Sequence, residues 1–494
     1  MYLLGYDIGS SSVKAALVNA ETGVTIATVQ SPDVEMEILA PSPGWAEQDP
    51  DIWWNNICLS TKKLLQKTAI PAERIGGIGI AYQMHGLVAV DEHGKALRPA
   101  IIWCDSRAVG VGDQAAEMIG HERCLAHLLN LPGNFTASKL KWVKENEPEI
   151  YANIHHIMLP GDYIALRLTG ETLTTPSGLS EGIFWDFKKD AAADFLLENL
   201  GFDNKLLPAV VPTFSLQGAL TQSAAEATGL KAGIPVAYRA GDQPNNAMSL
   251  NVLEPGEIAA TGGTSGVVYG VVDSPVYDPQ SRVNSFAHVN HSKNNPRIGI
   301  LLCINGAGSQ YAWLKKNFAG DGLSYSEMEQ MAAKIGAGAD GLRILPFGNG
   351  AERMLGNRNV GAYMINLHFN QHTKAHVYRA ALEGIAFSFV YGIAILKNMG
   401  LNVQVMRVGN DNLFQSAVFS SAISNLVGCR IELLETTGAV GAAKAAGVAT
   451  GFFSAVNEAM KGGTVVKVYE PTNINGLYAD AYLAWVKELE KALA

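Results

Sequence analysis

Two segments that lie half a chain apart share one pattern, in which an apolar run, a turn of glycine and hydroxyl residues and a second apolar run follow one another. Residues 6–18 read YDIGSSSVKAALV, and residues 259–269 read AATGGTSGVVY. Each pattern predicts a strand, a tight turn and a second strand. The repeat therefore predicts a duplicated architecture in which one such hairpin opens each half of the chain.

The composition of both turns indicates an anion site. Glycine allows the backbone to approach a ligand closely, and successive N–H groups and hydroxyls replace the water that a phosphate loses on binding. Neither segment matches the Walker phosphate loop, in which Gly-Lys-Ser/Thr precedes a helix. The alternative is a pair of hydrophobic hairpins whose turns hold no ligand. Because the pattern occurs twice, we interpret it as two phosphate-binding hairpins and predict an enzyme that binds ATP.

The length of the chain predicts more than one domain, since 494 residues exceed what one hydrophobic core usually serves. Strand-like runs alternate with helical patterns in both halves, which is typical of layered α/β domains. Residues 52–67, for example, carry apolar residues at helical spacing after an Asp-Pro-Asp start signal. We place the boundary in segment 251–256, which gives domains 1–250 and 251–494. Between them we expect a central cleft whose closure excludes water.

Charge and composition argue against several other classes of protein. The net charge of −9, without a basic cluster, argues against binding of nucleic acid. No run of about 18 apolar residues and no basic leader is apparent, so we expect no membrane span, no signal peptide and a cytoplasmic location. The five cysteines contain no CxxC pair, which argues against a disulfide framework and a zinc site. We expect them to be reduced and buried.

Further segments, taken together with the hairpins, resemble the FGGY carbohydrate kinases over nearly the whole chain. They are residues 44–54 (GWAEQDPDIWW), 97–107 (LRPAIIWCDSR), 136–146 (TASKLKWVKEN) and 162–171 (DYIALRLTGE). The resemblance implies an actin-like (ribonuclease H-like) ATPase fold of two duplicated α/β domains with a central cleft. It also implies that the first domain binds the sugar and the second binds the nucleotide.

Two segments depart from the family pattern. Residues 408–413 read VGNDNL, where the family's adenosine loop usually begins with two or three glycines. Asn366 stands where a glycine is customary in the C-terminal signature. Such changes mark either a subgroup or an altered preference for nucleotide or sugar.

Phosphoryl transfer to a sugar hydroxyl needs a proton acceptor, Mg²⁺ and hydrogen-bond donors around the transferred group. The resemblance implies that Asp242, in AGDQPNN, is the catalytic base, although Gly-Asp taken alone is more often a helix start. Asp7, beside the first turn, is the second catalytic candidate and the predicted metal ligand, because Mg²⁺ prefers oxygen ligands and retains several waters. The alternative for Asp7 is a turn-forming aspartate.

The cofactor contacts come from both hairpins and from two later loops. For the residues of the later loops, a helix start or a loop without a ligand is the alternative. Lys14 has a solvated side chain as its alternative. The predicted contacts are Ser10, Ser11, Ser12, Lys14, Gly263, Thr264, Gly306, Gln310, Gly409 and Asn412.

The sugar needs polar groups beside an apolar wall. Residues 83–86 (QMHG) follow a strand-like run, at a position where ligand sites of α/β folds gather. The predicted substrate contacts are Gln83, Met84, His85, Trp103, Asp105, Arg107 and Asp242. The alternatives are a core role for Met84, a structural role for His85 and an Arg107 that merely pairs with Asp105.

These residues predict an ATP- and Mg²⁺-dependent kinase with a small-molecule sugar substrate. The QMHG and WCDSR segments are most similar to those of family members that convert D-xylulose to D-xylulose 5-phosphate. Other acceptors, namely ribulose, gluconate, glycerol, sedoheptulose or another polyol, are the alternative within the family. Outside it, the rivals are a switch ATPase like actin and a sugar-responsive transcription factor. The family resemblance also implies a possible homodimer.

Overall fold

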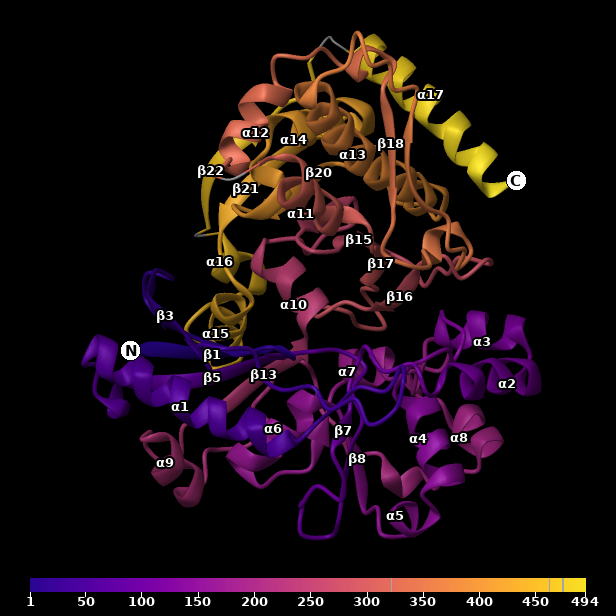
Figure 1. Ribbon diagram of the computed structural model, residues 1–494. Coiled ribbons are helices and arrows are strands. Elements are labelled where there is room, and N and C mark those ends of the chain that lie inside the picture. The colour runs from indigo at the N-terminus through magenta and orange to yellow at the C-terminus, as the bar shows by residue number, and fades with distance from the viewer. Residues whose placement is uncertain (321, 462, 473–474) are drawn as a thin grey trace. The chain divides into compact units, whose positions relative to one another are not determined.

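The computed structural model describes residues 1–320, 322–461, 463–472 and 475–494, which form two compact units (Figure 1). Unit 1 comprises Met1–Leu253, Phe286–Ile298 and Thr436–Gly462, and unit 2 comprises Glu254–Ser285, Gly299–Glu435 and Gly463–Ala494. Neither unit is therefore one continuous stretch of chain. We expected everything after residue 250 to belong to the second domain, but two later segments join unit 1.

The helices and strands of each unit follow one another in chain order. The main elements of unit 1 are β1 (Tyr2–Ile8), β2 (Val13–Asn19), β3 (Thr25–Ser31), β4 (Glu47–Gln48), α1 (Pro50–Thr68), β5 (Ile75–Tyr82), β6 (Val88–Val90), β7 (Ala100–Ile101), α2 (Val109–Ile119), α3 (His121–Leu128), α4 (Thr136–Asn146), α5 (Pro148–Ala152), β8 (His156–Met158), α6 (Pro160–Thr169), β9 (Leu173–Thr174), α7 (Pro176–Glu181), β10 (Trp185–Asp186), β11 (Ala191–Ala192), α8 (Asp194–Leu200), β12 (Ala209–Val210), α9 (Gln222–Thr228), β13 (Val236–Gly241), α10 (Asp242–Ser249), α15 (Gly438–Ala449) and α16 (Val456–Met460). The remaining elements are β14 (Glu257–Gly262), β15 (Gly266–Val272), β16 (Asn284–Ala287), β17 (Ile298–Ile304), α11 (Ala307–Phe318), α12 (Tyr325–Ala332), β18 (Arg343–Phe347), β19 (Gly361–Ile365), α13 (Lys374–Asn398), β20 (Val405–Gly409), α14 (Ala417–Val427), β21 (Arg430–Glu435), β22 (Thr464–Tyr469) and α17 (Asn475–Leu493).

Unit 1 is built on a sheet with the strand order β13-β5-β1-β2-β3. The first predicted hairpin is confirmed, because β1 pairs antiparallel with β2 from Tyr2↔Asn19 to Ile8↔Val13. β5 runs parallel to both β1 and β13. Helix α1 begins at the expected start signal, where the Asp49 side chain accepts a hydrogen bond from Asp51 N. Its Trp53 belongs to the same buried cluster as Tyr6 of β1.

Helix α15 covers the opposite side of this sheet (Figure 1). Its small residues allow a very close approach. An ideal Cβ at Gly79 of β5 would lie 1.9 Å from Ala442 O, and one at Gly5 of β1 would lie 2.0 Å from Ala439 O. The helix backbone therefore rests directly on the strands. This contact is the physical reason that residues 436–462 belong to unit 1.

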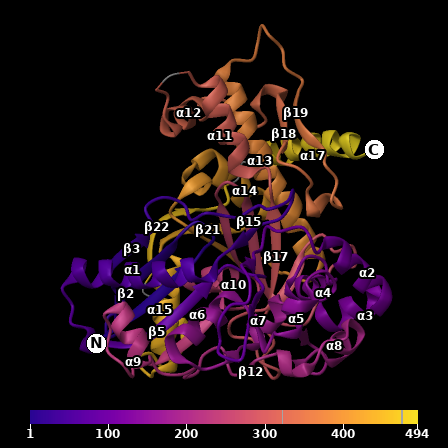
Figure 2. The same cartoon turned by 60° about the horizontal axis from the view of Figure 1, so that its bottom comes forward.

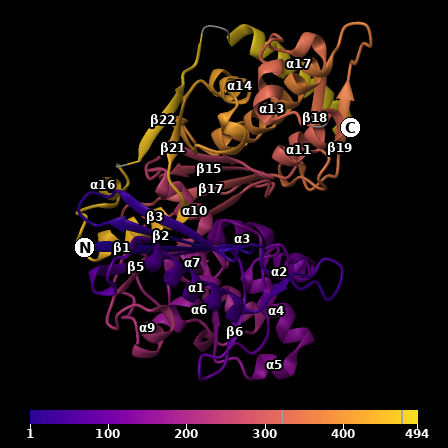
Figure 3. The same cartoon turned by 60° about the vertical axis from the view of Figure 1, so that its left-hand side comes forward.

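Unit 2 repeats the arrangement. Its sheet has the order β16-β17-β15-β14-β20-β21-β22, in which the segment from β17 to β21 corresponds to β3-β2-β1-β5-β13 of unit 1 (Figure 3). The second predicted hairpin is confirmed by the antiparallel pair β14 and β15, and β14 and β20 are parallel, as β1 and β5 are. Helix α13 packs against α11, α12 and α14 (Figure 2). The duplicated α/β fold is thus confirmed.

Helix α13 is long and apolar enough to span a membrane by length and composition alone. In the structure, 83% of its most apolar window is buried inside the protein. It is therefore the core helix of unit 2.

One of the two departures from the family pattern occurs where the backbone is left-handed, since Asn366 has a φ of 64°. Asparagine is the residue other than glycine that most readily adopts this conformation. Asn366 can therefore take the conformation that a glycine would take there. The expectation for the cysteines was wrong in part, because Cys104 and Cys303 are exposed.

Candidate active site

The chemically active segments of unit 1 meet at one edge of its sheet. The parallel strands β1, β5 and β13 end at Ile8, Tyr82 and Gly241, and the strand register places both Ile8 and Gly241 opposite Tyr82. Asp7 therefore lies near the same edge as Asp242, which is the first residue of α10. The carboxyl ends of parallel strands are where α/β folds gather their ligand sites. Asp242 does begin a helix, as the alternative interpretation held, and it nevertheless lies at this edge of the sheet.

The surroundings of these two carboxyl groups make their charged forms less favourable than in water. Burial, and to a lesser degree the neighbouring charge of Asp7, raises the pKa of Asp242 to about 7. Burial also raises the pKa of Asp7, while Lys14, opposite Asp7 in the strand register, lowers it. A carboxyl group that titrates near neutral pH is suited to accept a proton from a hydroxyl.

Two oxygen atoms beside the N-terminus of α15 fit a magnesium ion. The position of an ideal Cβ at Gly438 lies 2.5 Å from Asp7 Oδ2 and 2.8 Å from Asn246 Oδ1. Among the described residues, no group of three or more His, Cys, Asp or Glu side chains could hold a metal. One carboxylate and one amide oxygen nevertheless suit Mg²⁺, which usually takes one or two carboxylates and keeps several waters or phosphate oxygens.

The turn between β1 and β2 is closed by a backbone hydrogen bond and held by a side chain from β4. Gly9 N donates to Ser12 O at 3.0 Å, and Ser12 is buried while Ser11 is exposed. Gln48 Nε2 donates to Ser10 O at 2.6 Å. The half-exposed Trp103 places its indole nitrogen 3.5 Å from Ser10 Oγ. Trp103 thus lies beside the predicted phosphate turn and leaves one face to solvent.

Met84 and His85 follow β5 at the same sheet edge. Met84 is buried, and its Cγ lies 2.6 Å from the Cβ position of Gly241, next to Asp242 in the chain. The side chain of Gln83 is almost fully buried and donates to Gln48 Oε1 at 3.2 Å. Gln83 Oε1 is buried and has no hydrogen-bond partner among the described residues, which fits an atom that accepts from a ligand.

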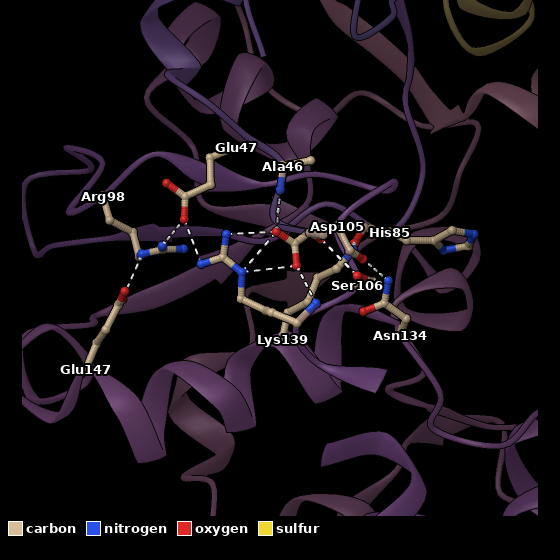
Figure 4. A network of polar contacts seen from close by, with 11 residues as sticks. Ala46, Glu47, His85, Arg98, Asp105, Ser106, Asn134, Lys139 and Glu147 are labelled. Atoms are coloured by element: carbon tan, nitrogen blue, oxygen red, sulfur yellow. Dashed lines mark hydrogen bonds and ion pairs between the residues drawn. The ribbon is translucent and has the colours of Figure 1, made fainter. Parts of the chain in front are cut away.

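The side chains of Asp105 and Arg107 are closed off from solvent. Both are almost fully buried in a chain of ion pairs, in which Arg107 bonds to Asp105 at 2.7 Å and to Glu47 at 2.7 Å (Figure 4). Arg98 extends the chain from Glu47 to Glu147. Asp105 also accepts a hydrogen bond from Ala46 N at 2.6 Å. Their oxygen and nitrogen atoms are committed to one another, so we withdraw both residues as sugar contacts and assign them to the framework.

Unit 2 contains a cavity of about 610 Å³ at the turn of its own hairpin. Gly263, Thr264 and Asn412 line it, as do Gly308, Tyr311 and Tyr325 from α11 and α12. Gly308 N donates to Gly263 O at 3.0 Å, and Ser309 N donates to Thr264 O at 2.9 Å. The start of α11 thereby holds the turn. Three of the six cofactor contacts predicted in this half are thus brought together.

The other three lie elsewhere. Gly306 N donates to the buried Glu352 carboxylate, and an ideal Cβ at Gly306 would meet Pro346 O at 1.9 Å. Gln310 lines a separate cavity of about 390 Å³. Gly409 ends β20 and is absent from the lining of the cavity at the turn. Gly308 and Ser309 of the first turn of α11 line the cavity at the turn, whereas Gly306 and Gln310 do not, because the direction of each group depends on the tertiary packing.

Sequence reasoning missed several residues of unit 1. Gln48, Lys139 and Glu181 contact predicted site residues in the structure, and Asn246 lies with Asp7 beside Gly438. Only Glu181 had a visible signal, since it is the one charged residue in the run GLSEGIFW. A charged residue in an apolar run is rarely buried unless it has specific partners.

The duplicated sheet, with carboxylates at the strand ends of one unit and a glycine-walled cavity in the other, defines the class of actin-like (ribonuclease H-like) ATPases. The models of the FGGY family of carbohydrate kinases match here, with the N-terminal domain at residues 2–249 and the C-terminal domain at residues 258–450. The chain therefore belongs to the FGGY family of carbohydrate kinases. It is a sugar kinase, and kinases of this family use ATP.

Known relatives resemble the chain along nearly all of its length. The xylulose kinase of Staphylococcus xylosus is 30% identical over 471 residues, which cover 92% of each protein. The structure of xylulose kinase from Rhodospirillum rubrum matches with a TM-score of 0.90 at 26% identity and covers 99% of each chain. Gluconate kinase from Lactobacillus acidophilus matches with a TM-score of 0.90 at 20% identity, over 100% of this chain and 98% of that one, and shows the fold alone.

Proposed function

We propose that the protein transfers the γ-phosphate of Mg-ATP to the terminal hydroxyl of D-xylulose, giving D-xylulose 5-phosphate and ADP. The observation that carries this proposal is the contact of Met84, a predicted sugar contact, with Gly241, the residue before Asp242. The similarity to xylulose kinases favours this acceptor. A cytoplasmic location and a homodimer are further parts of the proposal.

In this mechanism Asp242 accepts the proton of the attacking hydroxyl. A pKa of about 7 makes the carboxylate available at neutral pH while keeping it basic enough to take the proton. His85 and Gln83 orient the sugar through polar contacts, and Met84 and Trp103 supply its apolar wall. These residues hold the acceptor in one orientation, which lowers the entropic part of the barrier.

Asp7 and Asn246 would hold the magnesium ion, whose charge neutralises the triphosphate when it is bound. Ser10, Ser11, Ser12 and Lys14 contribute donors for phosphate from unit 1. In unit 2, the cavity at the turn is where we place the nucleotide, with Gly263 and Thr264 toward its phosphates and Asn412 toward its adenosine. Its volume of about 610 Å³ is within the range of cavities that take cofactors.

Gly308→Ala tests the nucleotide assignment. An ideal Cβ at Gly308 would lie 2.2 Å from Gly263 O, so the turn must move away from α11. Losing that contact costs about one hydrogen bond, and we expect KM for ATP to rise about tenfold while KM for the sugar stays within about twofold. Initial rates at varied ATP measure this. The control is Gly336→Ala, whose Cβ meets nothing within 4 Å. An unchanged KM for ATP in a folded Gly308→Ala protein would contradict the assignment.

A coupled assay of ADP release tests the function itself. The acceptor panel contains D-xylulose, D-ribulose, L-ribulose, L-xylulose, L-fuculose, gluconate and glycerol, with a control that lacks sugar. We expect D-xylulose to give the highest kcat/KM. Preference for another acceptor would leave the kinase activity as proposed and replace only the substrate. Gluconate kinase, which shares the fold, is an example of this alternative. ADP release that does not depend on sugar would instead favour a switch ATPase.

A further inference from the structure

His85 has a backbone conformation that few residues with a side chain adopt. Its φ is 62°, in the left-handed region. Two buried side chains hold the peptide groups on either side of it. The Glu181 carboxylate accepts from His85 N at 3.2 Å, and Lys139 Nζ donates to His85 O at 2.7 Å. Figure 4 shows Lys139 reaching the backbone of His85 while the imidazole ring points away from the ion-pair chain. The conformation is therefore imposed by specific partners.

Glu181 also controls the ring of His85. Its backbone carbonyl lies 2.9 Å from His85 Nδ1. A carbonyl can only accept, so Nδ1 carries the proton and the lone pair of the neutral ring is on Nε2. Phe135 and Phe286 pack against the ring at centroid distances of 4.8 and 5.3 Å. Both the orientation of the His85 ring and its tautomer thus depend on Glu181 of α7.

The Glu181 carboxyl group is buried close to other acids. Its side chain is 2% exposed, and no lysine or arginine of the described residues forms an ion pair with it, whereas His85 Nδ1 lies 3.8 Å from its Oε2. Burial raises its pKa well above the ordinary value, and the charges of Asp242 and Asp162 raise it further, whereas contacts with Tyr82 and with His85 N oppose the shift. The more distant Lys139 also faces it. The surroundings of Glu181 therefore favour the neutral form of its carboxyl group.

The same carboxyl group touches the segment that carries the base. Its two oxygens lie 3.1 and 3.2 Å from the Cβ position of Gly241, the residue before Asp242. Glu181 therefore contacts both the sugar-side segment at His85 and the backbone beside Asp242. One side chain thus connects the segment of His85 with the segment of Asp242.

We propose that Glu181 is a positioning residue for the acceptor sugar, which holds His85 in its left-handed conformation with Nε2 as the acceptor for a sugar hydroxyl. The inference rests on the proposed function, since it assigns His85 to the acceptor. It predicts that substitutions of Glu181 raise KM for the sugar and leave KM for ATP nearly unchanged. It also predicts that the effect passes through His85.

The test uses two substitutions of nearly equal volume in the full-length protein. Glu181→Gln keeps a side-chain oxygen that can accept from His85 N, so KM for the sugar should stay within about threefold. Glu181→Met fills the same space without accepting from His85 N, and should raise KM for the sugar about tenfold or more, as expected for a buried donor left without a partner. KM for ATP should stay within about twofold in both. Ser180→Ala, which removes the buried hydrogen bond that Ala287 N donates to Ser180 Oγ on the same helix, is the matched control.

A double-mutant cycle with His85→Ala separates positioning from general support of the fold. If Glu181 acts through His85, Glu181→Met adds less than a twofold rise in KM once His85 is absent. Additive effects, a parallel rise in KM for ATP, or a Glu181→Gln protein as impaired as Glu181→Met would overturn the proposal. Should Glu181→Met fail to fold, the behaviour of Glu181→Gln alone decides.

The acceptor in these assays is whichever sugar the panel selects, so a preference for a sugar other than D-xylulose leaves the inference standing. Failure of the wild-type protein to use any sugar would reject the proposed function directly. It would then reject this inference as well, before any variant is compared.

Discussion

Replacing Asp242 with asparagine is expected to lower kcat about a thousandfold while KM for the sugar changes less than about threefold. Asparagine preserves the shape of the side chain at the start of α10 but cannot take a proton at neutral pH. The hydroxyl then has to lose its proton without a base, whereas the contacts that bind the sugar stay in place. Steady-state kinetics with the best acceptor of the panel measure both constants.

The pH dependence of kcat/KM in the wild-type protein also tests whether Asp242 is the base. Because the pKa of Asp242 is raised to about 7, the base is protonated below neutral pH. We therefore expect kcat/KM to fall about tenfold per pH unit below pH 7 and to level off above it. The Asp242→Asn protein should lack this limb. An acidic limb that persists in the variant would assign the titration to another group.

The stability of the variant provides the control for folding. A raised carboxyl pKa contributes stability that is fully present below the ordinary value of 3.8 and is lost as the pH rises through about 7. At pH 8 the asparagine variant should thus unfold at a temperature no lower than the wild type. Asp113→Asn, at an exposed position of α2, should change neither kinetics nor stability. A folded Asp242→Asn protein with near-normal kcat would refute the assignment of the base.

Gly79→Ala is expected to cost about 3 kcal/mol of the free energy of unfolding of unit 1, the largest effect on stability that we predict. The added methyl group would lie 1.9 Å from Ala442 O, which is backbone and cannot rotate away. Helix α15 must then lift from β5, and its contacts with β1 weaken as well. Because α15 also carries Gly438 beside Asp7, we expect activity to fall together with stability.

Thermal and urea unfolding followed by circular dichroism measure this change. The matched control is Gly110→Ala in α2, where an ideal Cβ meets nothing within 4 Å and alanine favours the helix. It should leave stability unchanged or raise it slightly. A Gly79→Ala protein as stable as the wild type would show that α15 does not rest on β5 as closely as described.

Local patterns determined much of this protein. The two glycine and hydroxyl turns between apolar runs predicted both hairpins, since a tight turn between strands needs only neighbouring residues. The Asp49-Pro50-Asp51 signal predicted the start of α1. Resemblance to a family placed Asp7 and Asp242 among its candidates, and the structure brings both to one sheet edge.

Tertiary structure alone decided which side chains of these segments face a ligand. Asp105 and Arg107 lie in a motif next to Trp103, yet Arg107 pairs with Asp105 and with Glu47 of an earlier segment, and all three side chains are buried. Glu181 reaches His85 across 96 positions in sequence. Local spacing sets the periodicity of a helix or strand, but the partner of a buried charge is set by segments that only folding brings together. The sequence by itself thus determined the hairpins and the class of chemistry, and the packing of distant segments decided the contacts of the site.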